Sequence, residues 1–156
     1  MTSILRRTTF VVADAEASAR FYETVFGWTR FYDHELVARA GFPPVGPKDE
    51  PVKLVMLKAE DPLIGMLGFL QYLDPPFDTG VLQTRSKVRM GEPILVIQTD
   101  DVRGAHTRAV AGGATICQPP TDWSVPSHDG SSVIHLRSMS MFDPQGIYSE
   151  INQHLS

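Results

Sequence analysis

The sequence predicts an α+β fold in which a strand-helix-strand-strand-strand unit (βαβββ) occurs twice. One observation is the order of the patterns, because each half of the chain starts with a strand-like run, continues with a helix-like run and ends in strands. The other is spacing, because Asp14 and Gly27 bracket the first helix at the same separation as Asp100 and Gly113 bracket the second. A spacing that repeats in this way favours duplication of the whole unit.

Length and composition fit a single soluble domain, 1–156. The chain has 156 residues, of which 42% are hydrophobic and 21% charged, as in ordinary globular proteins. We expect a first unit, a connection and a second unit over 1–73, 74–92 and 93–153. A formal net charge of −4 without a Lys/Arg run argues against nucleic acid as a partner. No apolar run reaches membrane-spanning length, so we expect no membrane partner and a cytoplasmic protein.

The first half contains the clearest helix pattern of the chain. It follows a strand predicted over 4–12 and an N-capping Asp14, runs over 15–26 and ends at Gly27. Its sheet-facing residues are expected to be the bulky ones, namely Phe21, Tyr22, Val25 and Phe26. Three strands should follow, separated by a proline-rich loop over 38–51: these strands are 28–35, 52–58 and 63–73.

The second half repeats this order with a weaker helix. A strand over 93–99 precedes a helix over 102–112 whose buried side should carry Val102, Ala105 and Ala109. The remaining elements are a strand, a loop with three prolines and a closing hairpin, over 114–118, 119–131, 133–142 and 147–152. The one cysteine, Cys117, excludes an intrachain disulfide and is expected to be a small buried residue.

The closing hairpin places a carboxylate in the middle of a strand. Asp143, Pro144 and Gly146 occupy the favoured positions of a type I turn. In the strand that follows, odd-numbered residues share one face and even-numbered residues the other, so Glu150 lies on the face of Tyr148. A carboxylate there lies either at a solvated edge or inside a cavity that uses it.

Three stretches, 11–28, 99–120 and 142–151, together resemble the vicinal oxygen chelate superfamily. This superfamily includes glyoxalase I, extradiol dioxygenases and bleomycin-resistance proteins. The resemblance implies two βαβββ modules whose sheets curl into a cupped, partly open mixed β-barrel, with a ligand site on the concave face. It also implies a small-molecule ligand or substrate and a homodimer.

The metal enzymes of this superfamily use four strand positions, two per module, that carry His, Gln or Glu. By resemblance, the first corresponds to Arg7 and its counterpart in the second half to Ile94 or Pro93. Gln71 is a doubtful match for the third position, and Glu150 fits the fourth. A guanidinium stays protonated and has no lone pair to give to a cation. We therefore expect no metal ion and no other cofactor.

Glu150 is the candidate catalytic residue, and a second group of side chains could bind the substrate in the same cavity. The candidate substrate-binding residues are Arg7, Tyr148, His135, Arg137 and Trp123. If Arg7 faces the cavity, it can pair with Glu150 or flank a ligand carboxylate, phosphate or enolate, and otherwise it is a solvated strand residue. His135 could equally serve only the structure, and Trp123 could belong to a satellite core.

Two function classes stay open at this point. One is an isomerase, lyase or cyclase in which Glu150 is the general base and Arg7 stabilises developing negative charge. The other is a drug-sequestering or binding protein, whose cavity needs aromatic walls but no base. A third interpretation, a metal-dependent glyoxalase or extradiol dioxygenase, rests on the habits of the superfamily rather than on these residues.

Overall fold

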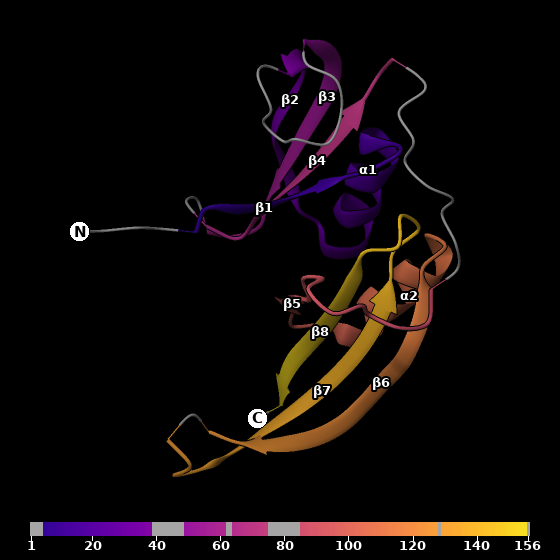
Figure 1. Ribbon diagram of the computed structural model, residues 1–156. Coiled ribbons are helices and arrows are strands. Elements are labelled where there is room, and N and C mark those ends of the chain that lie inside the picture. Colours follow the sequence, from indigo (N-terminus) through magenta and orange to yellow (C-terminus); the bar gives the residue numbers. More distant parts are fainter. Residues whose placement is uncertain (1–4, 39–48, 62–63, 75–84, 128, 156) are drawn as a thin grey trace, which may run out of the picture. The chain divides into compact units, whose positions relative to one another are not determined.

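The computed structural model describes residues 5–38, 49–61, 64–74, 85–127 and 129–155 (Figure 1). The chain divides into two compact units, Met1–Val81 and Leu82–Ser156. In its described residues each unit has a four-stranded sheet and one helix, in the order strand, helix and three strands. The α+β class and the twofold βαβββ order predicted from the sequence are therefore confirmed. Neither described helix is long and apolar enough to span a membrane.

The first unit forms a mixed sheet in the order β1-β4-β3-β2. Strand β1 runs parallel to β4, whereas β3 pairs antiparallel with both β4 and β2. Its elements are β1 (Arg7–Val11), α1 (Ala15–Phe26), β2 (Thr29–Ala38), β3 (Glu50–Lys58) and β4 (Met66–Tyr72). The predicted loop over 38–51 falls mostly on residues 39–48, which lie outside the described residues.

Helix α1 packs on this sheet through the face that its sequence predicts. The side chain of Asp14 accepts a hydrogen bond from the Ala17 amide at 2.8 Å, and Gly27 ends the helix in the left-handed conformation with φ 72°. Phe21, Tyr22 and Val25 are buried, as expected, while Phe26 is only half-buried. The ring of Tyr22 lies 5.4 Å from that of Phe69 on β4, which joins the helix to the sheet.

The second unit repeats the plan in the sheet order β5-β8-β7-β6. Strand β5 runs parallel to β8, and β7 pairs antiparallel with β8 and β6. Its elements are β5 (Leu95–Gln98), α2 (Val102–Ala111), β6 (Thr115–Pro126), β7 (Val133–Phe142) and β8 (Tyr148–Leu155). Helix α2 buries Val102, Ala105 and Ala109, which confirms its predicted face.

The loop predicted over 119–131 is wrong in its first part, where the structure has strand β6. The strand continues to Pro126 because it is an edge strand that pairs only with β7, so its prolines need not donate to a neighbour. Two of these prolines, at 119 and 120, fall between Gln118 and Thr121, where the pairing register shifts in a bulge. Trp123 is consequently a strand residue opposite Leu136.

The prediction that Cys117 is a buried residue is also wrong. Cys117 is exposed on β6, next to the first register shift of the strand, rather than buried in the core. Partial desolvation by the surrounding chain raises the pKa of its thiol. The thiol therefore stays protonated near neutral pH, which does not favour a role as a nucleophile.

The turn between β7 and β8 forms as predicted and sets which residues of β8 face the helix. The Gly146 amide donates to the Asp143 carbonyl at 2.9 Å, and Gly146 has φ 81°. The buried Asp143 carboxylate accepts from the amides of Gln145 and Ile147 at 2.9 and 2.8 Å. Ser149 and Ile151 are then buried on the face of β8 that carries Gln153, which contacts the start of α2, whereas Tyr148, Glu150 and Asn152 lie half-buried on the other face.

A pair of matching contacts, one within each unit, shows which residues of the two units correspond in the repeat. The amide of the first residue of α1, Ala15, donates to the Gln71 side-chain oxygen at 3.0 Å. The amide of the first residue of α2, Val102, donates to the Gln153 side-chain oxygen at 3.3 Å. Gln71 is thus the counterpart of Gln153, and three residues earlier the counterpart of Glu150 is Gly68.

Candidate functional site

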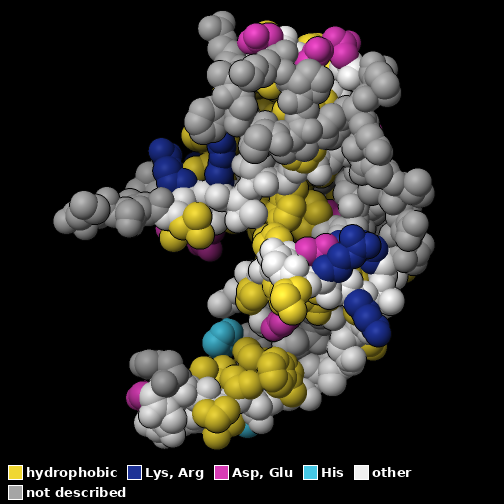
Figure 2. All heavy atoms as spheres, in the orientation of Figure 1, with side chains coloured by type: hydrophobic (Ala, Val, Ile, Leu, Met, Phe, Trp, Pro, Cys, Tyr) yellow, Lys and Arg dark blue, Asp and Glu magenta, His cyan; other side chains and the backbone are white. Residues whose placement is uncertain are grey.

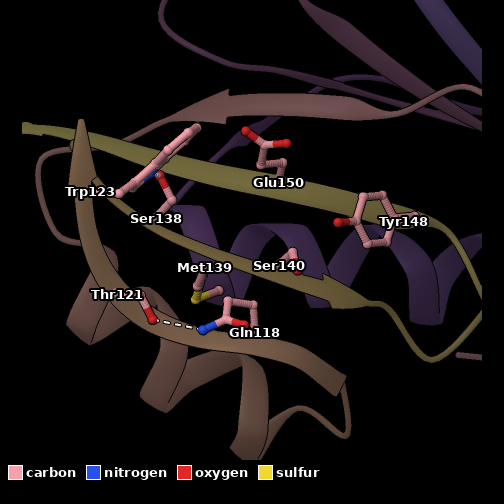
Figure 3. A pocket seen from close by; sticks show the side chains of 8 residues that line it. All are labelled: Gln118, Thr121, Trp123, Ser138, Met139, Ser140, Tyr148 and Glu150. Atoms are coloured by element: carbon pink, nitrogen blue, oxygen red, sulfur yellow. Dashed lines mark hydrogen bonds between the residues drawn. The ribbon is translucent and has the colours of Figure 1, made fainter. Parts of the chain in front are cut away.

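A pocket of about 230 Å³ lies on the face of β6, β7 and β8 that α2 does not cover (Figure 3). Its lining mixes hydroxyl, amide and aromatic side chains around one carboxylate. The lining residues are Gln118, Thr121, Trp123, Ser138, Met139, Ser140, Tyr148 and Glu150. Figure 2 shows hydrophobic side chains gathered on the visible face of this unit. Trp123 in the pocket lining is 46% exposed.

A chain of hydrogen bonds holds the Glu150 carboxylate. The Trp123 indole N–H donates to Ser138 Oγ at 2.7 Å, and the Ser138 hydroxyl donates to Asn152 Oδ1. The Asn152 Nδ2 amide group then donates to Glu150 Oε1 at 3.2 Å. These four residues come from three adjacent strands, and we call them the Trp123–Glu150 relay. The relay fixes one carboxylate oxygen and links it to an aromatic wall of the pocket.

The second carboxylate oxygen has a different environment. Within the described residues, no hydrogen bond reaches Glu150 Oε2. Figure 3 shows the Glu150 side chain on the same side of the sheet as Trp123 and Tyr148. A carboxylate that is held through one oxygen can present the other to a ligand, either as a hydrogen-bond acceptor or as a base.

The structure brings three of the six predicted site residues together. Glu150, Tyr148 and Trp123 all line the pocket. Tyr148 packs its ring against Phe142 at 5.1 Å between centroids, which steadies this wall. Trp123 joins the site because β6 extends through the segment where the sequence predicts a loop.

The other three predicted residues are not among the described residues that line the pocket. Arg137 on β7 forms a two-pronged ion pair with Asp122, at 2.6 and 2.7 Å, and this contact lowers the pKa of the Asp122 carboxyl. His135 is exposed on the same strand and is not among the described residues that line the pocket. Arg7 begins β1 in the first unit, where its guanidinium lies against the Met56 thioether.

Sequence reasoning missed the polar residues that complete the pocket. Ser138 and Ser140 alternate on β7, which is the pattern of two residues on one face, but Thr121, the partner of Ser138 on β6, falls in the segment that the sequence predicts as a loop. Asn152 could be placed on the face of Glu150 by the same alternation. Its contact with Ser138 depends on the register of β7 and β8, in which these two residues are opposite.

The donor set does not fit a divalent metal ion of the superfamily's kind. Asp101 caps α2 and accepts from the Gly104 amide at 2.8 Å, so the counterpart of Arg7 is Ile94 rather than Pro93. Gly68 is the counterpart of Glu150 in the repeat, so three of the four ligand positions of the superfamily carry Arg, Gly and Ile. Among the residues that the structure describes, no group of three or more His, Cys, Asp or Glu side chains could hold a metal.

The chain belongs to the Glyoxalase/Bleomycin resistance protein/Dioxygenase superfamily, whose family model matches residues 4–151. The superfamily resemblance seen in the sequence is therefore confirmed. No curated protein matches the chain closely enough in sequence to count as a relative.

Solved structures of this superfamily share the fold at low sequence identity. A glyoxalase family protein from Bacillus cereus superposes with a TM-score of 0.75 at 15% identity, over 99% of this chain and 97% of that chain. A glyoxylase/bleomycin resistance protein/dioxygenase domain from Frankia sp. EAN1pec gives 0.62 at 14% identity, over 99% and 100% of the two chains. A glyoxalase I mutant from Zea mays gives 0.58 at 18%, over 95% of this chain and 46% of that chain. At these identities the likeness concerns the fold alone.

Proposed function

We propose that this protein binds a small organic molecule in the pocket of the second unit and catalyses a proton transfer on it without a divalent metal. The reaction type is that of an isomerase, lyase or cyclase. The observation that carries the proposal is the Trp123–Glu150 relay, because it orients a carboxylate at a pocket that is large enough for a small ligand.

In this proposal Glu150 Oε2 takes a proton from a carbon or hydroxyl of the ligand while Asn152 stays bonded to Oε1. In an isomerisation the protonated carboxyl returns the same proton to another ligand atom, so no other reactant is consumed. Tyr148 is two residues from Glu150 on the same strand face, and its hydroxyl is the lining group best suited to donate to a developing oxyanion. Arg7, the oxyanion partner expected from the sequence, stays a prediction.

The alternative function is binding or sequestration without turnover. One observation favours it: among the described lining residues, Glu150 and Tyr148 are the only side chains that titrate. A proton-transfer enzyme often needs a second acid or base of suitable pKa, whereas a binding protein needs only shape and aromatic walls. The expected homodimer and cytoplasmic location are compatible with both functions and stay predictions.

Solvent exchange separates the two functions. Ligands found by a thermal-shift screen are incubated with the protein in deuterated water and followed by proton NMR. We expect a carbon-bound proton of at least one ligand to exchange for deuterium, or the ligand to be converted, only when protein is present. Ligands that bind at the pocket and never exchange or change would support sequestration instead.

The metal content of the purified protein tests the metal-free part of the proposal. Since Arg, Gly and Ile occupy three of the superfamily's four ligand positions, we expect no stoichiometric Zn, Ni, Fe or Mn after mild purification. Elemental analysis by mass spectrometry measures this directly. About one such ion per chain, lost in a Glu150→Ala variant, would contradict the proposal.

A further inference from the structure

The pocket has a negative charge and no positive charge of its own. Among its described lining residues, Glu150 is the only carboxylate, and none is Lys, Arg or His. A ligand carboxylate or phosphate placed here would meet a like charge at short range, which is unfavourable in a partly desolvated site. The negative charge of the Glu150 carboxylate therefore disfavours anionic ligands in this pocket.

Two arginines of the second unit that contact these strands are already engaged in other interactions. Arg137 is paired with Asp122 through two guanidinium nitrogens, Nε and Nη2, and its side chain is only 20% exposed. Arg85 pairs with Glu92, donates to the Gly146 carbonyl at 3.0 Å and lies over the Phe142 ring. Moving either guanidinium to the pocket would break a charge-assisted contact, so neither is available to neutralise Glu150.

The walls of the pocket suit a flat, positively charged group. The Trp123 side chain is 46% exposed, and its indole N–H is fixed by Ser138, so the ring is held in place while part of it stays open to a ligand. Tyr148 supplies a second ring on the same side of the sheet (Figure 3). Faces of Trp and Tyr rings attract cations, and the attraction adds to that of a nearby carboxylate.

We propose that the ligand of this pocket is a planar organic cation, such as a quaternary or protonated aromatic amine. Its ring stacks on Trp123, and its positive charge lies beside Glu150 Oε2. This inference rests on the proposed function for the location of the ligand, and it goes further by naming the ligand's charge and shape. It does not depend on whether the bound molecule turns over.

Three probes of one shape and different charge test the proposal. N-methylquinolinium is a cation, quinoline is neutral near neutral pH, and quinoline-2-carboxylate is an anion. Binding is followed through Trp123 fluorescence in a Trp28→Phe background, since the chain has two tryptophans. We expect the cation to bind at least about tenfold more tightly than quinoline, and the carboxylate to bind most weakly.

Two substitutions that remove one negative charge each show whether Glu150 causes the preference. Glu150→Gln should reduce the preference for N-methylquinolinium over quinoline by about tenfold and leave only the part that comes from the aromatic rings. Asp100→Asn is the matched control, because it removes an exposed carboxylate of the same unit that lies outside the pocket lining, and it should keep the preference. In the unaltered pocket, added salt should weaken binding of the cation and leave that of quinoline nearly unchanged, which tests the charge without a Glu150 variant.

The outcomes separate a wrong ligand class from a wrong site. Equal or tighter binding of quinoline or quinoline-2-carboxylate, with Trp123 still quenched, would overturn the cation and leave the pocket as the ligand site. A cation preference that is unchanged in Glu150→Gln would also overturn it. If none of the probes quenches Trp123 up to about 1 mM, both the ligand class and the pocket as its site are wrong.

Discussion

Glu150→Gln should lower the turnover rate of a converted ligand by about 100-fold or more at saturating concentration. The substitution keeps the size of the side chain and its place beside Asn152, but it removes the oxygen that would take the proton. Binding should weaken by a smaller factor, about tenfold for a cation, because the aromatic walls remain. The loss in kcat at saturation therefore reports the proton transfer separately from binding.

Asp100→Asn is again the matched control for this rate measurement. It changes the net charge of the second unit by the same amount, and Asp100 is exposed outside the pocket lining, so kcat should stay within about twofold of the unaltered protein. Unchanged kcat in Glu150→Gln would show that another group takes the proton, even with the fold and the pocket correct. Circular dichroism of both variants checks that they remain folded.

Phe69→Ala should lower the free energy of unfolding of the first unit by about 3–5 kcal/mol. Phe69 is fully buried on β4 and packs against Tyr22 of α1, so its removal leaves a cavity between helix and sheet. Phe31→Ala on β2 is the same chemical change at a side chain that is 51% exposed, and it should cost less than about 1 kcal/mol.

Urea unfolding followed by fluorescence compares the two phenylalanine variants. The midpoint of Phe69→Ala should fall well below that of the unaltered protein, with that of Phe31→Ala close to it. Equal midpoints for the two variants would mean that the contact between α1 and β4 is not the core of this unit.

Local sequence signals predicted the elements that are stabilised by neighbouring residues in the chain. Helix α1 has its capping Asp14 and its left-handed Gly27 at the expected places, and the turn at Asp143 closes through its own side chain. Both features depend on hydrogen bonds within a few residues, so no tertiary information is needed to foresee them.

The full length of strand β6 could not be predicted in this way, and the contacts that it makes in the site could not be predicted either. Prolines and a tryptophan in a short polar run are typical of a loop, whereas an edge strand with a bulge accepts the same residues. Only the pairing of β6 with β7 shows that Asp122 lies beside Arg137 and occupies its guanidinium. Arg137 therefore looked like a substrate-binding group from the sequence alone.

Glu150 and Tyr148 could be predicted because strand alternation is a local property. The residues that hold Glu150 in place could not. Asn152 reaches Glu150 along the same strand, whereas Ser138 and Trp123 come from two other strands. The match of Gln71 to Gln153, which assigns Gly68 as the counterpart of Glu150, likewise needs the contacts of both glutamines with the helix N-termini. Contacts between strands decide these points, and a single sequence does not contain them.

The most direct test of the central claim is to map ligand binding onto the second sheet by NMR. A fragment library that contains planar cations, neutral molecules and anions is titrated into isotope-labelled protein, and backbone amides and the two tryptophan indole N–H groups are followed. We predict that shift changes from the best-binding fragment cluster on Trp123, Ser138, Tyr148 and Glu150, with the Trp123 indole among the largest. Shift changes confined to the first unit, around Arg7 on β1 for example, with Trp123 and Glu150 unmoved, would contradict the assignment of this pocket as the functional site.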